Sequence, residues 1–327
     1  MRIVITGRGG FLGSRLARAL VARGRLTGPD GGEHEISRIV LLDTGFPGPR
    51  QDGPCVETVT GDLSDPATLE RVVTPDTTSL FHLAAVVSGA AEADFDLGMR
   101  VNFDGTRLVL ERLRRCTRPP RVVFSSSVAA FGGDLPAELD DSTTANPQTS
   151  YGAQKVAGEY LVSDYSRKGF IDGRSLRLPT IVVRAGAPNA AASSFASGIV
   201  REPLNGRLSA CPVGSETGVW LLSPREVTDA FLHAHELPAA AWGLNRVVNL
   251  PGITVTVAQM LEALARVAGS HVAERVRWTP DERIRAIVRT WPVRFRTPRA
   301  LAMGFKPDAD IDTVIRNYIA DEGIRTG

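Results

Sequence analysis

A tyrosine and a lysine four residues apart, Tyr151 and Lys155, are the side chains of this sequence best suited to do chemistry. On a helix, positions i and i+4 lie on one face, so the phenol and the ammonium would point the same way. A phenol ordinarily has a pKa near 10, and a neighbouring ammonium favours its ionised form. The pair can therefore supply a base that removes the proton of an alcohol.

A run of three serines precedes this pair, at the end of a short apolar stretch typical of a buried strand, residues 121–124. A hydroxyl from the run can orient a substrate oxygen beside the tyrosine. The spacing Y-x-x-x-K also occurs by chance, as two exposed residues of a helix. The serines in front of it favour alcohol oxidation, which also needs a hydride acceptor.

A glycine-rich turn near the start of the chain indicates what that acceptor is. Residues 3–13 read IVITGRGGFLG, a buried strand followed by glycines at 7, 10 and 13 and an amphipathic helix. Gly7 permits a sharp turn, Gly10 lets the backbone approach a pyrophosphate, and Gly13 lets the helix lie close to the strand. Glycine-rich turns are common, so this motif alone is weak evidence for a dinucleotide site.

Asp43, at the end of the second predicted strand (38–42), favours NAD as the dinucleotide. A carboxylate there accepts hydrogen bonds from both adenosine ribose hydroxyls and repels the 2′-phosphate of NADP. Arg8, inside the glycine turn, is discordant, because a cation at that place can receive a 2′-phosphate.

The hydrophobic pattern predicts an α/β fold, a doubly wound parallel sheet that is Rossmann-like, with a smaller C-terminal substrate lobe. We assign residues 1–185 to the NAD-binding domain, with 220–250 returning to it, and 186–219 and 251–327 to the lobe. The remaining predicted elements are strands at 56–59, 79–85, 175–184 and 246–250, helices at 94–115, 151–168 and 220–237, a loop at 24–35, and a mostly helical C-terminal part.

Two polar residues near predicted strand ends have alternative interpretations. Asp62 can accept a hydrogen bond from the adenine amino group, or it can belong to a helix cap, a role that Ser64 or Asp65 also suits. His82, inside an apolar run, is more typical of a hydrogen-bonded core residue than of a catalyst.

Composition excludes several classes of function. The chain has 327 residues, of which 43% are hydrophobic and 23% charged, as in ordinary soluble proteins, and its net charge of +2 does not suggest nucleic acid. Three widely spaced cysteines fit neither a disulfide framework nor a metal site. No signal peptide and no apolar run of membrane-spanning length is evident, so we expect a cytoplasmic protein that needs no metal and binds no membrane.

Taken together, these motifs resemble the extended short-chain dehydrogenase/reductases, the NAD-dependent epimerase/dehydratase family. The resemblance covers essentially the whole chain and rests on TGRGGFLG (6–13), Asp43, GDL (61–63), HLAA (82–85), VNFDGT (101–106), FSSSVAAFG (124–132) and YGAQK (151–155). It implies that Tyr151 is the acid/base, Lys155 its pKa-lowering partner, Ser127 the catalytic serine and Asn102 the residue that supports the lysine, often through water. Phe131 stands where the family often has tyrosine.

We accordingly expect the cofactor NAD to contact the glycine turn, the strand ends and the catalytic helix: Gly7, Gly10, Phe11, Leu12, Gly13, Asp43, Asp62, Leu63, Leu83, Ala84, Ala85, Asn102, Ser125, Tyr151, Lys155 and Pro179. Four stretches, 86–106, 177–204, 220–225 and 236–238, are similar to a subgroup of the family. That similarity implies NAD-dependent oxidation of the C2 hydroxyl of a four-carbon sugar acid.

A carboxylate substrate calls for a bidentate cation, and Arg184 and Arg225 are candidates by position, although each can equally be a surface ion-pair residue. Short polar groups that suit a polyol complete the predicted substrate contacts: Ser88, Ser127, Thr180, Asn189 and Ser193.

Two other functions remain open from the sequence. A nucleotide-sugar epimerase or dehydratase of the same family would keep NAD bound and would need a pocket for a base, yet residues 186–220 contain only Phe195 and Trp220 as aromatic residues. A non-catalytic dinucleotide sensor commonly loses the tyrosine or the lysine. The resemblance also implies a homodimer formed through the helices at 94–115 and 151–168.

Overall fold

A computed structural model describes residues 1–46, 53, 55–186 and 191–325 of the chain. These residues form two compact units. The first contains 1–130, 149–177 and 228–248, and the second contains 131–148, 178–227 and 249–327. The division differs from the predicted boundary at 185, because the chain passes from the first unit into the second after residue 177. The chain also enters the second unit at residues 131 and 249.

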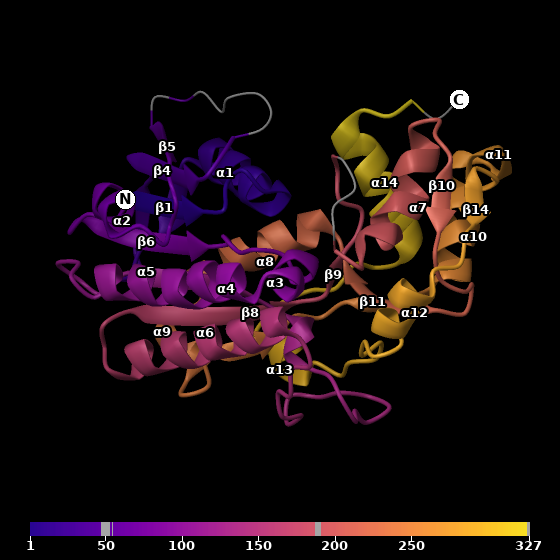
Figure 1. Cartoon of the computed structure of the whole chain (residues 1–327). Helices are drawn as coiled ribbons and strands as arrows, with labels where there is room; N and C mark the ends of the chain where they lie inside the picture. Colours follow the sequence, from indigo (N-terminus) through magenta and orange to yellow (C-terminus); the bar gives the residue numbers. More distant parts are fainter. Residues whose placement is uncertain (47–52, 54, 187–190, 326–327) are drawn as a thin grey trace. The chain divides into compact units, whose positions relative to one another are not determined.

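A seven-stranded sheet is the centre of the first unit, in the order β12-β8-β7-β6-β1-β4-β5 (Figure 1). Its four registered pairings, β5 with β4, β4 with β1, β1 with β6 and β6 with β7, are parallel. The strands are β1 (Arg2–Thr6), β4 (Arg38–Asp43), β5 (Val56–Thr60), β6 (Thr77–His82), β7 (Arg121–Ser127), β8 (Asp172–Leu178) and β12 (Val247–Asn249).

The strand order reverses at β1, which places a ligand-binding crevice beside it. The chain runs from β1 outward to β4 and β5 and then returns to β6 on the other side of β1. At such a switch point the loops after neighbouring strands diverge, and ligands bind outside the carboxyl ends of the strands. The predicted doubly wound sheet is thus confirmed, and the residues after β1, β4 and β6 are placed to form a site.

The helices of the first unit cover the sheet. Helix α1 (Phe11–Arg23) follows β1, and α5 (Gly105–Leu113) packs against both α2 (Pro66–Val72) and α6 (Ser150–Arg167) (Figure 1). The apolar core beneath them contains Val4, Leu80 and Phe124. The short helices α3 (Ser88–Ala93), α4 (Phe95–Gly98) and η2 (Val128–Ala130) contact α6 or its neighbours, and α9 (Ala239–Trp242) precedes β12.

Four sequence predictions of local structure are wrong. The predicted strand 175–184 is interrupted by Pro179, which has no N–H, so β8 ends at Leu178. The loop 24–35 contains a hairpin of β2 (Arg25–Thr27) and β3 (Glu33–Glu35). The predicted helix 220–237 is a strand, β11 (Gly218–Leu222), followed by α8 (Pro224–Glu236), because Pro224 can begin a helix but cannot lie inside one.

The fourth concerns the predicted helix 94–115. It is divided into α4, a π-helical segment η1 (Met99–Asp104), and α5, with Gly98 and Gly105 at the junctions. A π turn widens the helix locally and redirects side chains, and this one carries Asn102.

The second unit has its own core around the strand set β13-β11-β9, with β9 (Thr180–Ile181) parallel and β13 (Ile253–Thr256) antiparallel to β11. Helices α7 (Ser194–Leu204), α10 (Val257–Ala268), α11 (Ser270–Ala273) and α14 (Ile311–Glu322) pack together in it, and β10 (Ser209–Cys211) pairs with β14 (Val276–Trp278). Helices α12 (Glu282–Val288) and α13 (Pro298–Ala302) complete the unit. Thr256 caps α10 with a full capping box, as its position predicts.

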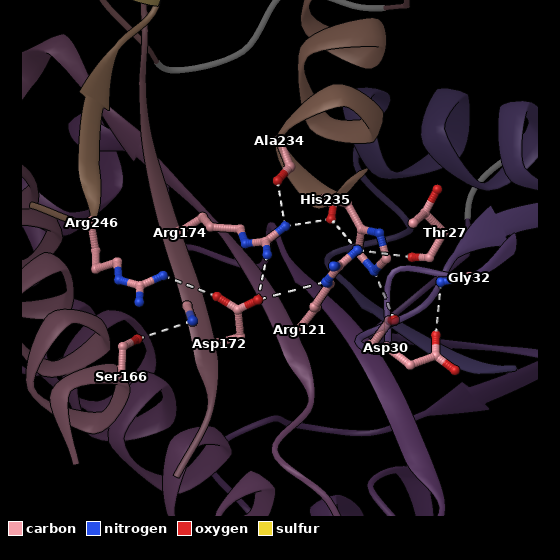
Figure 2. Close-up of polar contacts among 12 residues, drawn as sticks. Thr27, Asp30, Gly32, Arg121, Ser166, Asp172, Arg174, Ala234, His235 and Arg246 are labelled. Carbon is pink, nitrogen blue, oxygen red and sulfur yellow. Dashed lines mark hydrogen bonds and ion pairs between the residues drawn. The ribbon is translucent and has the colours of Figure 1, made fainter. Parts of the chain in front are cut away.

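Two buried arginines, at the beginnings of β7 and β8, connect these strands to the end of α8 (Figure 2). Arg174, which is fully buried, donates from one Nη to the carbonyl oxygens of Ala234 (2.6 Å) and His235, and from the other to Asp172. Arg121 donates to the His235 carbonyl at 3.0 Å. Two cations thus satisfy the last carbonyls of the helix, where the helix dipole favours positive charge.

We predict that Asp172→Asn destabilises the first unit strongly, by about 3 kcal/mol, because it leaves the buried guanidinium of Arg174 without its carboxylate. Thermal unfolding of the variant should show a melting temperature several degrees lower. Asp30→Asn, which removes the exposed Asp30–His34 ion pair, is the control and should leave that temperature unchanged. Equal melting temperatures for the two variants would contradict this role of Asp172.

Candidate active site

Two glycines of the turn after β1 are required by the packing of the protein itself. Gly7 has a φ of +78°, and a Cβ on it would lie 2.5 Å from the backbone nitrogen of Ala84. A Cβ on Gly13 would lie 2.4 Å from the Gly7 carbonyl oxygen. The turn can therefore lie against the end of β6, and α1 can begin directly over it, only with glycine at both positions.

Gly10 is less closely enclosed by the protein itself than Gly7 and Gly13. A Cβ there would meet only the Gly7 oxygen, at 3.2 Å, among the described residues. Gly10 is also the N-cap of α1, and no described side chain caps that helix. The first turn, with Phe11 and Leu12, therefore presents backbone N–H groups and the positive end of a 13-residue helix dipole. This arrangement fits the pyrophosphate of a dinucleotide.

Asp43 lies at the carboxyl end of β4, next to the turn. Its carboxylate accepts a hydrogen bond from the backbone N–H of Gly9 at 2.8 Å, so it also fixes the turn. Arg8 is 4% exposed, and its guanidinium lies 5.6 Å from the centre of the Phe46 ring. The guanidinium is therefore packed on an aromatic face, with a buried Nε that has no hydrogen-bond partner in the described residues.

Asp62 and Leu63 follow β5. Asp62 accepts from the backbone and hydroxyl of Ser64 (2.8 and 2.7 Å) and from Arg100 (2.6 Å). Burial alone would raise the pKa of Asp62, but these hydrogen bonds lower it, so the carboxylate stays ionised. Asp65, not Asp62, is the N-cap of α2. Leu63 is buried against α5, where a Cβ on Gly105 would collide with it.

His82 connects the ends of two strands to the π-helical segment. Its Nδ1 lies 2.6 Å from the Thr6 hydroxyl, its Nε2 lies 3.0 Å from the Thr106 hydroxyl, and Thr106 donates to the carbonyl of Asn102 at 2.6 Å. Because the single hydroxyl proton of Thr106 is used on Asn102, Nε2 must donate to Thr106 and Nδ1 must accept from Thr6. Burial, with the nearby Lys155 charge, lowers the pKa of His82 to about 3, so the ring is neutral. His82 is thus a hydrogen-bonded core residue.

Leu83 and Ala84, which follow His82, lie next to the glycine turn. The backbone N–H of Leu83 donates to the Thr6 carbonyl at 3.1 Å, and Ala84 is the residue that Gly7 approaches. These two predicted cofactor residues therefore contact β1 and its glycine turn.

Asn102 is buried in η1 and is held by three hydrogen bonds. Its amide accepts from Val86 N (2.8 Å) and donates to Val86 O (3.1 Å) and to the side chain of Gln154 (2.8 Å). Gln154 adjoins Lys155 in α6. The structure therefore connects Asn102 to α6 through Gln154, a contact that the sequence did not predict.

The lysine and the serine run meet where α6 lies on the end of β7. Lys155 is 3% exposed, and its Nζ donates to the carbonyl oxygen of Ser125 at 2.8 Å. The ammonium lies 4.8 Å from the centre of the Phe124 ring and 5.6 Å from that of Tyr151. Ser125 donates to the His82 carbonyl at 3.1 Å, and the Ser127 hydroxyl accepts from Ala129 N at 3.1 Å.

Burial lowers the pKa of Lys155 to about 7, and the Glu159 carboxylate opposes that shift. The ammonium therefore lies close to its deprotonation point near neutral pH, beside a phenol that it can help to ionise. This arrangement suits the reversible oxidation of an alcohol. It combines a base, a cation that lowers the pKa of that base, a serine at a strand end and a turn that fits a dinucleotide.

The predicted substrate residues are distributed over both units. Ser88 begins α3 in the first unit, and Ser127 ends β7. In the second unit, Thr180 begins β9, directly after the predicted cofactor residue Pro179, and Ser193 is the N-cap of α7. Asn189 lies outside the described residues.

The two candidate arginines differ in their surroundings. Arg225 donates to Asp321 at 3.0 Å and to Asn317 at 2.8 Å, as an ion-pair residue of the second unit. The backbone N–H of Arg184 donates to Ser197 at 3.0 Å. The guanidinium of Arg225 thus holds a carboxylate of the protein itself, as its alternative interpretation as an ion-pair residue predicts.

Two charged residues close to Lys155, the buried Glu159 and Arg177, whose side chain is 12% exposed, were not among the predicted site residues. Glu159 follows Lys155 by four positions, so the helical spacing that identified the Tyr151–Lys155 pair also indicates it. Arg177 carries no such signal, because only the fold brings β8 beside α6.

The described residues contain neither a metal-binding cluster nor a membrane-spanning helix. They contain no group of three or more histidines, cysteines or acidic residues arranged to hold a metal ion. None of their helices has the length and apolar character needed to cross a membrane.

Comparisons with known proteins agree on one family. The model of the NAD dependent epimerase/dehydratase family matches residues 3–249. A D-erythronate dehydrogenase of Cupriavidus necator is 56% identical over 324 residues, covering 99% of each chain. One of Haemophilus influenzae is 45% identical over 98% of this chain and 99% of its own. The crystal structure of a nucleoside-diphosphate-sugar epimerase from Agrobacterium tumefaciens superposes with a TM-score of 0.94 at 39% identity, covering 100% of this chain and 96% of that one.

We predict that Gly13→Ala mainly lowers the stability of the protein, whereas Gly10→Ala mainly weakens the binding of NADH. Gly13→Ala should destabilise the protein by about 1–3 kcal/mol, since its Cβ is forced against the backbone. Gly10→Ala should fold with nearly the parent melting temperature but bind NADH at least about tenfold more weakly, because its methyl group occupies the approach to the phosphates. NADH fluorescence titration and thermal unfolding measure both quantities. Parent-like NADH affinity in Gly10→Ala would contradict the assignment of the phosphate site.

Proposed function

This chain belongs to the NAD dependent epimerase/dehydratase family, and from that premise we propose that it oxidises the C2 hydroxyl of D-erythronate to the 2-keto acid with NAD. The observation that carries the proposal is the joint presence of the Tyr151–Lys155–serine set and near full-length similarity to two D-erythronate dehydrogenases. A sequence identity of 56% with the Cupriavidus necator enzyme, over 99% of both chains, favours a shared substrate as well as a shared fold.

In the proposed reaction the protein supplies the proton acceptor and the orientation. The Tyr151 phenolate takes the hydroxyl proton of the substrate, and the buried Lys155 ammonium stabilises that phenolate. The Ser127 hydroxyl donates a hydrogen bond to the substrate oxygen and holds it at the tyrosine. The nicotinamide, when bound, accepts the hydride that leaves C2. The proton and the hydride together account for the two hydrogens lost from the alcohol.

We infer NAD rather than NADP from Asp43. Its carboxylate lies at the end of β4, where an adenosine ribose is bound in this type of fold, and it carries a negative charge next to the turn. Arg8, the competing cation, is packed on Phe46. We also propose that substrate binding involves Ser88, Thr180, Arg184 and Ser193, and that the second unit is the substrate lobe.

The family resemblance further suggests a cytoplasmic homodimer that pairs through α4, α5 and α6. Two large apolar side chains on these helices support this proposal, since Phe95 of α4 is 59% exposed and Tyr160 of α6 is 72% exposed. Light scattering of the purified protein gives the oligomeric state directly.

A nucleotide-sugar epimerase is the second candidate, favoured by the TM-score of 0.94 to the structure from Agrobacterium tumefaciens. An epimerase returns the hydride to its product and forms no net NADH. Incubation with D-erythronate and, separately, with UDP-glucose distinguishes the two. Net NADH absorbance with D-erythronate alone supports the dehydrogenase, and turnover of UDP-glucose without NADH overturns it.

We predict that Tyr151→Phe lowers kcat for D-erythronate oxidation by about 10²–10⁴-fold, because the proton acceptor is lost. NADH binding should persist, which fluorescence titration can verify. The variant keeps the aromatic ring beside Lys155. Parent-like turnover would show that Tyr151 is not the base.

We predict that Asp43→Asn narrows the preference for NAD over NADP by about tenfold, since removing one charge near the 2′-position is worth about 1.4 kcal/mol. Asparagine retains an oxygen for the Gly9 N–H, so the turn is preserved. Steady-state kcat/KM with each dinucleotide measures the ratio. Arg8→Met is the matched control, and a larger change there than in Asp43→Asn would transfer the discrimination to Arg8.

A further inference from the structure

A buried ion pair lies directly beside the catalytic lysine. Glu159, one helical turn after Lys155 in α6, is 3% exposed. Arg177 of β8 donates its Nε to one carboxylate oxygen at 2.8 Å and an Nη to the other at 2.6 Å. The geometry is bidentate, which is the strongest arrangement for this pair of groups.

The same carboxylate also holds the middle serine of the run. The Ser126 hydroxyl donates to Glu159 at 2.5 Å. Its neighbour Ser125 accepts the Lys155 ammonium through its carbonyl oxygen, and its other neighbour is Ser127. One carboxylate oxygen therefore fixes the strand end from which both the lysine acceptor and the proposed catalytic serine come.

Little else in the surroundings of Lys155 can balance its charge. Strand β7 contributes the Ser125 carbonyl and the Phe124 ring, β6 contributes His82, which is neutral, and η1 contributes the uncharged Asn102. Among the described residues, Glu159 is the one carboxylate that raises the pKa of Lys155.

Three other ionisable groups on the elements that pack against α6 have partners elsewhere or lie far along the helix. Glu92 of α3 accepts from Ser150 N, Arg100 of η1 pairs with Asp62, and Glu111 of α5 accepts from Tyr165, ten residues beyond Lys155. Ten residues of helix span about 15 Å.

We propose that the Glu159–Arg177 ion pair is a positioning element of the catalytic set, which holds Lys155 as an ammonium and fixes the serine-bearing end of β7. The inference rests on the proposed dehydrogenase function, because it assigns a role to residues that support the same tyrosine and lysine. It adds two residues that touch neither substrate nor cofactor.

The pair explains how a buried ammonium is kept charged without being drawn away from the tyrosine. A buried carboxylate with no other donor would bind the ammonium directly. Both carboxylate oxygens of Glu159 are occupied by Arg177 and Ser126, so Glu159 acts on Lys155 through its charge. Lys155 can then direct its hydrogen bond to Ser125.

The charge model makes the two single substitutions act in opposite directions. Glu159→Gln removes one negative charge and keeps the Arg177 guanidinium, so the surroundings of the lysine become more positive and the ammonium loses its proton at a lower pH. Arg177→Met leaves the carboxylate uncompensated, so the ammonium persists to a higher pH. The double variant Glu159→Gln/Arg177→Met restores a neutral environment and should return near the parent value.

The chain is suited to a direct measurement, because it has three lysines, Lys155, Lys168 and Lys306. Lysine labelled with ¹³C at Cε gives one NMR signal for each, and Lys155→Met assigns the signal of interest. We expect the titration midpoint of Lys155 to fall by about one pH unit in Glu159→Gln and to rise by about one in Arg177→Met. The signals of Lys168 and Lys306 should not move and serve as internal controls.

Activity provides the second readout. At neutral pH, kcat for D-erythronate should fall at least about tenfold in Glu159→Gln, where Lys155 is largely neutral, and should recover in the double variant. A purely structural role predicts lost stability in the single variants with the Lys155 midpoint unchanged.

The proposal is overturned if the two single variants shift the midpoint in the same direction, or if neither shifts it. The double variant keeps the test decisive where a single variant unfolds, since a midpoint far from the parent value there also contradicts the charge model. The titration uses no substrate, so its outcome is independent of whether D-erythronate is oxidised.

Discussion

The buried ammonium of Lys155 sets the constraint on which the catalytic part of this structure depends. A lysine at 3% exposure is stable only with an acceptor, a polarisable surrounding and a compensating charge, and the Ser125 carbonyl, the Phe124 ring and Glu159 provide these. The first two require α6 to lie very close to the end of β7, whereas Glu159 lies on α6 itself. Gly158 permits this approach, because a Cβ there would be 2.8 Å from the Phe124 ring.

The same close packing continues across the sheet to the glycine turn. The turn after β1 touches Ala84 at the end of β6, and His82, two residues earlier, hydrogen-bonds with both Thr6 and Thr106. A neutral histidine with one fixed tautomer can hold both hydroxyls in place at any physiological pH. The cofactor turn and the π-helical segment that carries Asn102 are therefore parts of one hydrogen-bonded unit.

Features that depend on spacing along the chain could be predicted from the sequence. The Tyr151–Lys155 pair, the glycine turn and the carboxylate after the second strand lie within short motifs, and the structure places each at a carboxyl end of the sheet or on the helix beside it. Features that depend on contacts between distant segments could not. The Arg177 contact with Glu159, the Gln154 contact with Asn102 and the ion pair that occupies Arg225 join residues 18 to 96 positions apart.

Deuterium transfer from D-erythronate labelled at C2 tests the central claim, that this site removes a hydride from C2 and releases it on the dinucleotide. The purified protein is incubated with the labelled substrate and NAD, and both products are analysed by mass spectrometry. The account predicts that the label is found in NADH, in equal amount to an unlabelled 2-keto acid. Label retained in the organic product, or net NADH that carries no label, would contradict it.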